Sequence, residues 1–183
     1  GKVFCCSEWE GQDYRRIGIA ADYVNNGITL PKNLAGVAEG TVRPKFRIIT
    51  SGRIVAQKNP ALFNAIANYF QEFDDFEFVW AGDGEDRAVL KANNITVTGW
   101  LTNDQVKALI EQSHIYLSTS VYEGLSFAVL EALALKKPML LSACVGNRDV
   151  IKKGLNGNLF KNETEAIIKI LSYYNNREML HIM

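Results

Sequence analysis

The chain has 183 residues, of which 48% are hydrophobic and 22% are charged, so it can bury a sizeable core and is not intrinsically disordered. Twenty basic and twenty acidic residues cancel, which leaves no electrostatic argument for nucleic acid as a partner. The three cysteines, Cys5, Cys6 and Cys144, fit neither a zinc-binding spacing nor a disulfide framework, so we expect reduced thiols in the cytosol. No apolar run approaches the roughly 18 residues of a transmembrane helix.

Residues 1–40 differ in pattern from the rest of the chain. We expect a strand and then a helix within 3–19, and a second strand leading into a turn within 23–33. The stretch 33–44 is small, polar and ends in proline, as connectors often are. Because the chain opens directly on a strand pattern, we expect it to be part of a longer protein. Residues 1–40 would be the tail of a preceding N-terminal domain and a linker, and residues 41–183 the second domain.

From about residue 46 onward, strand and helix patterns alternate, separated by short turns. Most of the strands are apolar throughout, which predicts an α/β domain with a doubly wound parallel sheet covered on both faces. The strands are expected at 46–52, 76–84, 95–100, 114–120, 138–143 and 156–160, and the helices at 60–73, 85–93, 102–113, 126–135, 147–154 and 163–176.

Sheets of this kind bind ligands beyond the carboxyl ends of their strands, where loops lead into helices. A binding site should therefore be assembled from these loops. We expect them to begin at Gly52, Gly82, Trp100, Ser120, Ala143 and Gly157.

Two cations follow the first strand of the sheet. Gly52 permits a tight turn there, Arg53 can donate two hydrogen bonds to phosphate oxygens, and Lys58 adds a point charge five residues later. The next helix would add the positive end of its dipole. This combination suits a pyrophosphate, although two solvated surface cations would produce the same spacing.

Two glutamates flank a helix start in "EGLSFAVLE", residues 123–131. The helix should begin near Leu125 or Ser126, which leaves backbone N–H groups of residues 124–127 unpaired and attractive to anions. Glu131 lies about 9 Å further along the helix axis among core-like neighbours, where a carboxylate needs a partner such as a pair of ligand hydroxyls. The alternative is that Glu131 forms a salt bridge within the fold and Glu123 is solvated.

The other motifs in the sequence do not indicate a binding or catalytic site. The G-x-G of "AGDGED" has Arg87 in place of the third glycine of a dinucleotide fingerprint and follows the second strand of the sheet, so a tight turn is the better interpretation. No P-loop, Ser-His-Asp set or metal-ligand set is present, and His114 is best explained as a structural residue at a strand start.

Together, "GRIVAQKNP", "WAGDGED", "EGLSFAVLE" and "GLNGNLF" resemble the C-terminal, nucleotide-binding domain of the retaining glycosyltransferases of family 4, also called glycosyl transferases group 1. The resemblance covers about residues 46–175, and "NNGI" at 25–28 is similar to the stretch where that family's chain enters this domain. It implies a Rossmann-like sheet that forms one half of a GT-B fold, with 41–183 as the nucleotide-sugar-binding domain.

The resemblance also implies roles for particular residues. Arg53 and Lys58 would hold the donor's diphosphate, Glu123 would bind sugar hydroxyls and support an oxocarbenium-like transition state, and Glu131 would bind the ribose. Two cations and helix N–H groups would neutralise the leaving group, so we expect no metal and no cofactor. The remaining donor-binding residues would be Gly52 beside the diphosphate, Gly124, Leu125, Ser126 and Phe127 around phosphate and sugar, and Trp100, Leu101 and Asn103 around the base.

The implied activity is transfer of a sugar from a nucleoside-diphosphate sugar to an acceptor, with retention of configuration. The acceptor would be a glycan or lipid-linked sugar held by the missing N-terminal domain, so we expect this chain alone to be inactive. The full-length enzyme would serve cell-surface polysaccharide, lipopolysaccharide or glycolipid synthesis in the cytoplasm, at the inner face of the membrane. A GT-B sugar-nucleotide epimerase and a non-catalytic nucleotide-binding module are the alternatives.

Two residues depart from the family pattern. Ser126 stands where a glycine is usual, but a small side chain still permits close approach of a ligand. Lys136 stands where a glycine often ends the helix, which would cost about 1 kcal/mol if the position is left-handed.

Overall fold

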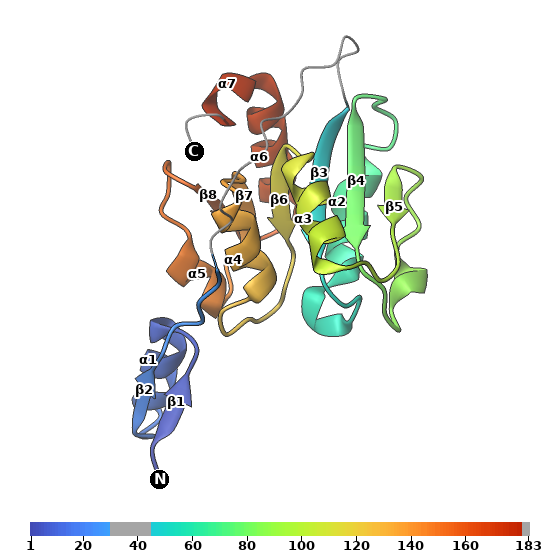
Figure 1. Ribbon diagram of the computed structural model, residues 1–183. Helices are drawn as coiled ribbons and strands as arrows, with labels where there is room; N and C mark the ends of the chain where they lie inside the picture. Colours follow the sequence, from blue (N-terminus) through green and yellow to red (C-terminus); the bar gives the residue numbers. More distant parts are fainter. Residues whose placement is uncertain (30–44, 181–183) are drawn as a thin grey trace.

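The computed structural model describes residues 1–29 and 45–180, so the connector expected at 33–44 lies outside the described residues. A six-stranded sheet dominates it, and its strand order is β5-β4-β3-β6-β7-β8 (Figure 1). Each strand pairs with its neighbours in parallel. The strands are β3 Phe46–Ser51, β4 Phe76–Ala81, β5 Ile95–Val97, β6 Ile115–Ser118, β7 Met139–Ser142 and β8 Gly157–Phe160.

The sheet is buried on both faces, which explains the continuous apolar runs in its strands. One face packs against Phe63 of α2, Phe70 just after α2 and Ile170 of α6, and the other against Ile110 of α3 and Val129 of α4. Figure 1 shows α3 and α4 in front of the sheet with α2 and α6 behind it. The predicted Rossmann-like, doubly wound parallel sheet is thereby confirmed. The helices are α2 Pro60–Tyr69, α3 Asn103–Glu111, α4 Phe127–Ala134, α5 Val145–Val150, α6 Glu163–Asn175 and α7 Arg177–Leu180.

Four local predictions were wrong. The helix expected at 85–93 is only a 3₁₀ turn, Arg87–Val89, because the N–H groups of Lys91 and Ala92 donate to Asn64 Oδ1 and not to carbonyls of a continuing helix. The helix expected at 147–154 is α5, which begins and ends earlier. The second strand expected within 23–33 is β2, Ala21–Tyr23, which ends at the residue where it was expected to begin.

The fourth error concerns Gly157, which we expected to start a loop beyond a strand. Gly157 is instead the first residue of β8, and the loop after that strand begins at residue 161. A Cβ atom at Gly157 would collide with the carbonyl of Met139 on the neighbouring strand. The glycine is therefore required for close approach of two strands, not for a turn.

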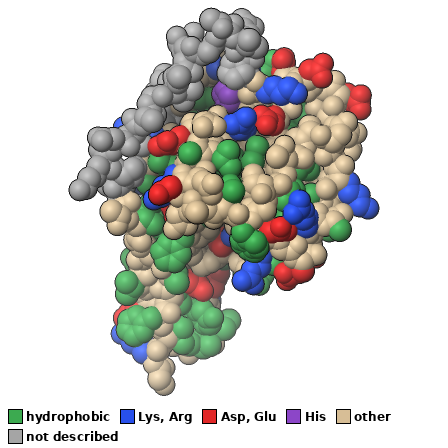
Figure 2. All heavy atoms as spheres, turned by 45° about the vertical axis from the view of Figure 1, so that its right-hand side comes forward, with side chains coloured by type: hydrophobic (Ala, Val, Ile, Leu, Met, Phe, Trp, Pro, Cys, Tyr) green, Lys and Arg blue, Asp and Glu red, His purple; other side chains and the backbone are tan. Residues whose placement is uncertain are grey.

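Residues near the N-terminus form a separate small unit, in which β1 Val3–Cys5 pairs in parallel with β2 Ala21–Tyr23. The helix between them, α1 Glu8–Arg16, packs against α5 of the larger domain. Figure 2 shows hydrophobic side chains gathered on this unit, below the larger domain. The unit thus buries little apolar surface of its own, and its assignment to a preceding domain stays a prediction. Its exposed large hydrophobic residues are Phe4, Trp9, Tyr14, Ile17, Ile19 and Tyr23.

Candidate functional site

The site lies where the strand order reverses. Strands β3 and β6 are neighbours, but the chain continues from β3 toward β4 and from β6 toward β7, on opposite sides. The loops after β3 and β6 therefore diverge and leave room for a ligand at the carboxyl ends of the strands. These loops span residues 52–59 and 119–126, and they carry most of the predicted site residues.

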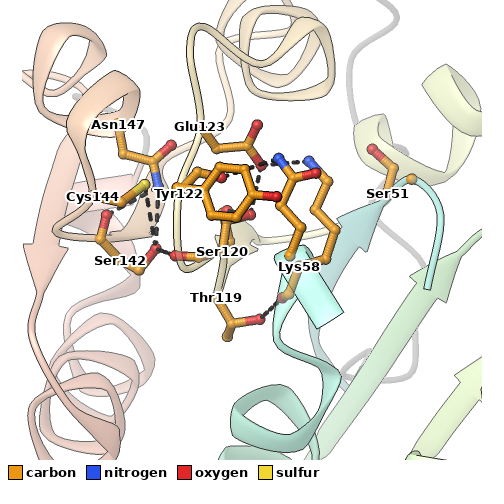
Figure 3. Close-up of polar contacts among 12 residues, drawn as sticks. Ser51, Lys58, Thr119, Ser120, Tyr122, Glu123, Ser142, Cys144 and Asn147 are labelled. Atoms are coloured by element: carbon orange, nitrogen blue, oxygen red, sulfur yellow. Dashed lines mark hydrogen bonds and ion pairs between the residues drawn. The ribbon is translucent and has the colours of Figure 1, made fainter. Parts of the chain in front are cut away.

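An ion pair joins the two loops. Lys58 Nζ lies 2.5 Å from Glu123 Oε1, although the two residues are 65 positions apart in the sequence (Figure 3). The Glu123 side chain is 7% exposed and that of Lys58 is 21% exposed. Ser120 Oγ donates a second hydrogen bond to Glu123 Oε1 at 2.7 Å, and Ser118 Oγ lies 3.2 Å from Ser120 Oγ. Glu123 is therefore a buried, compensated carboxylate and not a solvated one.

Hydrogen bonds between the two loops, each involving a backbone group, fix the position of the Lys58–Glu123 pair. Thr119 Oγ1 donates to the carbonyls of Lys58 at 2.7 Å and of Asn59 at 3.1 Å. Gln57 accepts from Val121 N–H at 2.9 Å and donates through its side chain to the carbonyl of Tyr122 at 3.1 Å. Gln57 and Thr119 were not among the predicted site residues, because their roles depend on contacts across the sheet.

Strand β7 and helix α5 support the Glu123 loop from the other side. Ser142 Oγ donates to the carbonyl of Ser120 at 2.6 Å, and Asn147 Nδ2 donates to Ser142 Oγ at 3.2 Å (Figure 3). Gly146 N–H donates to the carbonyl of Glu123 at 3.0 Å, and a Cβ atom at Gly146 would collide with the carbonyl of Gly124. These residues were also missed, and the only local signal for them was a glycine just after a strand.

Two groups near the site stay neutral at neutral pH. Burial raises the pKa of the Tyr116 hydroxyl, which lies 3.1 Å from Ser51 Oγ at the end of β3. Burial also raises the pKa of the Cys144 thiol at the start of α5. The cysteines are free thiols in the structure, as expected. The charges of the site therefore come from its cations and carboxylates.

Helix α4 begins as the sequence predicts, with Ser126 as its N-cap residue. The Ser126 side chain makes no capping hydrogen bond, and the amides of Leu125, Ser126 and Phe127 donate to no other described residue. Such free N–H groups, together with the helix dipole, favour an anion at this end of the helix.

Arg53 and Glu131 differ from the Lys58–Glu123 pair. Arg53 is exposed, and Glu131 is half-buried on α4. Within the described part of the chain, neither side chain has a recorded hydrogen bond or salt bridge, so the alternative of an internal salt bridge for Glu131 finds no support there. Both remain available to a ligand.

Trp100, Leu101 and Asn103 lie at the edge of the sheet, after β5. Trp100 is 67% exposed, and Asn103 is the first residue of α3, whose capping box is formed by Thr102 and Gln105. Because β4 lies between them, strand β5 lies roughly 10 Å from β3 across the sheet. Trp100, Leu101 and Asn103 thus belong to a third loop at the carboxyl ends of the strands, separate from the two loops that form the ion pair.

The glycines of "AGDGED" serve backbone packing. A Cβ atom at Gly82 would collide with the carbonyl of Gly52, and one at Gly84 with the backbone of Ile54. Trp80 Nε1 also donates to the Gly52 carbonyl at 3.0 Å. Both glycines let the loops after β3 and β4 lie in contact, so their observed role is close backbone approach, whereas the sequence had favoured a tight turn.

Within residues 1–29 and 45–180, no three His, Cys, Asp or Glu side chains are grouped so that they could hold a metal ion. No helix in the same part of the chain has the length and hydrophobicity needed to span a membrane.

Solved structures share this fold. A variant of TarM from S. aureus, in a complex that includes alpha-GlcNAc-glycerol and UDP, matches with a TM-score of 0.83 at 19% identity, over 99% of this chain and 38% of that one. HepE from Anabaena, in complex with UDP and glucose, matches with a TM-score of 0.78 at 17% identity, over 98% of this chain and 55% of that one. The described architecture is accordingly one half of a GT-B fold.

Curated relatives match over most of this chain. The UDP-Gal:alpha-D-GlcNAc-diphosphoundecaprenol alpha-1,3-galactosyltransferase of Escherichia coli is 28% identical over 87% of this chain and 46% of its own length. The alpha-monoglucosyldiacylglycerol synthase of Acholeplasma laidlawii is 25% identical over 77% of this chain and 38% of its own length. The chain thus spans less than half the length of these two relatives. The sequence model of the family described as Glycosyl transferases group 1 matches residues 38–183, and the chain belongs to this family.

Proposed function

We propose that this chain is the donor-binding half of a retaining glycosyltransferase, which transfers a sugar from a nucleoside-diphosphate sugar to an acceptor. The observation that carries the proposal is the buried Lys58–Glu123 pair at the point where the strand order reverses. Arg53 and Glu131, which have no recorded side-chain partner among the described residues, belong to the same loops or to the adjoining helix. Cations can bind the phosphates of a ligand and carboxylates can bind its hydroxyls, so this set of residues fits a ligand that carries both.

The cations act on the leaving group. When the sugar–phosphate bond breaks, negative charge develops on the nucleoside diphosphate, and Arg53 and Lys58 stabilise it together with the free amides of Leu125, Ser126 and Phe127. Positioned cations and helix dipoles need no reorganisation as this charge develops. The same groups neutralise the diphosphate without a metal ion, and metal-independent binding is part of the proposal.

The carboxylates act on the neutral parts of the donor. Glu123, at the loop, accepts hydrogen bonds from sugar hydroxyls and supports the positive charge that develops on the sugar ring. Glu131, further along α4, accepts from the ribose hydroxyls. Trp100, Leu101 and Asn103 frame the base, and Gly52 and Gly124 let the backbone approach the ligand closely.

The acceptor is bound by an N-terminal domain of the full-length protein, so this chain alone transfers no sugar. The E. coli relative acts on a sugar linked to diphosphoundecaprenol and the Acholeplasma relative makes a glycolipid, which supports an acceptor of the glycan or lipid-linked class. We place the full-length enzyme in the cytoplasm, associated peripherally with the inner face of the membrane, in the synthesis of cell-surface polysaccharide, lipopolysaccharide or glycolipid.

Isothermal titration calorimetry of the 183-residue chain with UDP and with GDP tests the proposal. We expect at least one nucleotide to bind equally well with EDTA and with Mg²⁺, and Arg53→Ala and Glu131→Gln to weaken that binding about tenfold each, the loss expected for a charge-assisted hydrogen bond. Lys107→Ala, at an exposed lysine on α3, is the matched control and should change nothing. Absence of binding by the unaltered chain, or equal affinity in all variants, would contradict the proposal.

A further inference from the structure

A hydrogen bond joins the N-terminal segment to the loop at residues 119–126. Asn26 Nδ2 donates to the carbonyl of Leu125 at 2.7 Å, across 99 positions of sequence. Asn26 follows β2 and lies outside the six-stranded sheet, whereas Leu125 is buried immediately before α4. In Figure 1 the segment after β2 passes beside α4 and α5. A side chain from outside the sheet therefore reaches the helix start described above.

This bond determines how the next peptide group is oriented. The carbonyl of Leu125 and the N–H of Ser126 belong to one planar trans peptide unit, in which they point in opposite directions. Because Asn26 holds the carbonyl on its own side, the Ser126 N–H is directed away from Asn26. That N–H is one of the amides at the start of α4 that donate to no other described residue.

Two neighbouring carbonyls of the loop are held by other parts of the chain. Gln57 binds the carbonyl of Tyr122 and Gly146 binds that of Glu123. Among the described side chains, Asn26 is the one recorded as binding the carbonyl of Leu125. Without it, the Leu125–Ser126 peptide could rotate and present a carbonyl oxygen, with its partial negative charge, where an N–H is needed.

The N-terminal unit does not depend on Asn26 for its attachment. Helix α1 packs against α5, Trp9 N–H donates to Asp149 Oδ2 at 3.4 Å, and Cys6 and Glu10 lie beside Gly124. Loss of one side-chain hydrogen bond should leave these contacts in place, so the effect of Asn26 should be confined to the peptide it holds.

We propose that Asn26 is a positioning residue for the donor site, which orients the Ser126 N–H toward the diphosphate. The proposal rests on the proposed function, since it assumes that a nucleoside diphosphate occupies the start of α4. Asn26 does not touch the ligand in this proposal, and it acts through the Leu125–Ser126 peptide.

The test compares Asn26→Ala and the isosteric Asn26→Asp, which has no N–H donor, with the neighbouring control Asn25→Ala. Asn25 is exposed, and no side-chain hydrogen bond from it to another described residue is recorded. Calorimetry with UDP should show affinity about three- to tenfold lower for both Asn26 variants, the loss of one hydrogen bond, and unchanged affinity for the control. Binding of uridine, followed by ligand-observed NMR, should be equal in all forms, because uridine lacks the phosphates.

A second measurement follows the Ser126 amide directly by NMR. On addition of UDP, the ¹⁵N–¹H signal of Ser126 should shift strongly in the unaltered chain and weakly in Asn26→Ala. UDP binding by the unaltered chain with equal affinity in Asn26→Ala overturns this inference alone, as does a parallel loss of uridine binding and of thermal stability. Failure of the unaltered chain to bind any nucleotide overturns the proposed function and this inference with it.

Discussion

The loop at residues 119–126 and helix α4 each contain one glutamate, and the two glutamates differ in burial and in hydrogen bonding. Glu123 in the loop is 8% exposed and accepts hydrogen bonds from Lys58 and Ser120. Glu131 on α4 is half-buried and has no recorded side-chain partner among the described residues. The two side chains belong to one continuous stretch of nine residues, yet one is bound within the protein and the other is not.

The difference follows from the cost of burying charge. A carboxylate that is almost fully removed from water destabilises the fold unless a cation and hydrogen-bond donors accompany it. A half-buried carboxylate keeps part of its hydration, so it needs no partner within the protein before a ligand binds. We therefore expect substitutions around Glu123 to reduce stability and substitutions at Glu131 to reduce affinity alone.

Lys58→Met should have the largest effect on stability. It removes the cation from Glu123, whose side chain is 7% exposed, and leaves the Ser120 hydroxyl as the one remaining side-chain partner among the described residues. We expect the free energy of unfolding to fall by about 3 kcal/mol, the lower end of the range for breaking a buried ion pair, because Lys58 itself retains some exposure. Urea unfolding followed by circular dichroism measures this.

Two controls isolate the buried pair. Lys107→Met breaks an exposed pair with Asp104, 3.9 Å long, and should cost about 0.5 kcal/mol or less. Adding Glu123→Gln to Lys58→Met should recover much of the loss, because no uncompensated charge is then buried. Additive losses in the double variant would show that the pair is not coupled.

Gly146→Ala tests whether the Glu123 loop needs its contact with α5. The added Cβ atom would collide with the carbonyls of Gly124 and Glu123, so loop and helix must separate. We expect the free energy of unfolding to fall by about 2 kcal/mol, as in other overpacked sites. Gly27→Ala is the control, because a Cβ atom there meets nothing within 4 Å. Equal stability of the two variants would mean that the loop adapts freely.

Glu131→Gln should lower the affinity for UDP without lowering the stability of the fold. If Glu131 binds the ribose hydroxyls, loss of its charge should weaken UDP binding about tenfold, or about 1.4 kcal/mol. The midpoint of thermal unfolding should stay the same, because the carboxylate has no recorded partner to lose within the described residues. Glu72→Gln, an exposed glutamate after α2, controls for the change in net charge. A large fall in the unfolding midpoint would contradict the contrast drawn between the two glutamates.

The fold could be predicted from sequence because its signals are local. Apolar strand runs and the position of Ser126 at the start of α4 are decided within a few residues. Gly157 misled the prediction because its role, close approach to Met139 on the next strand, depends on a partner 18 positions away. Glycines for turns and glycines for close approach look the same in a sequence.

The candidate site could be predicted only in part, for the same reason. Its residues follow from loop positions, but the bond from Lys58 to Glu123 crosses 65 positions and has no local signal. The apolar neighbours of Glu131 suggested that it was the buried carboxylate, whereas the structure buries Glu123 more deeply. Burial of a loop residue depends on what packs over it, and here that is α5 with Gly146, which only the three-dimensional arrangement reveals.

Lys136→Gly should have the smallest effect, and it concerns the far end of α4. Lys136, which stands where a glycine often ends the helix, has a φ of 54°, so the position is left-handed. Glycine adopts this conformation without steric cost, so the substitution should raise the free energy of unfolding by about 1 kcal/mol. Lys136→Ala removes the same charge but keeps the Cβ atom, and should bring no such gain. Because this position is remote from the start of the helix, UDP affinity should stay unchanged while stability rises, the opposite of the result expected for Glu131→Gln.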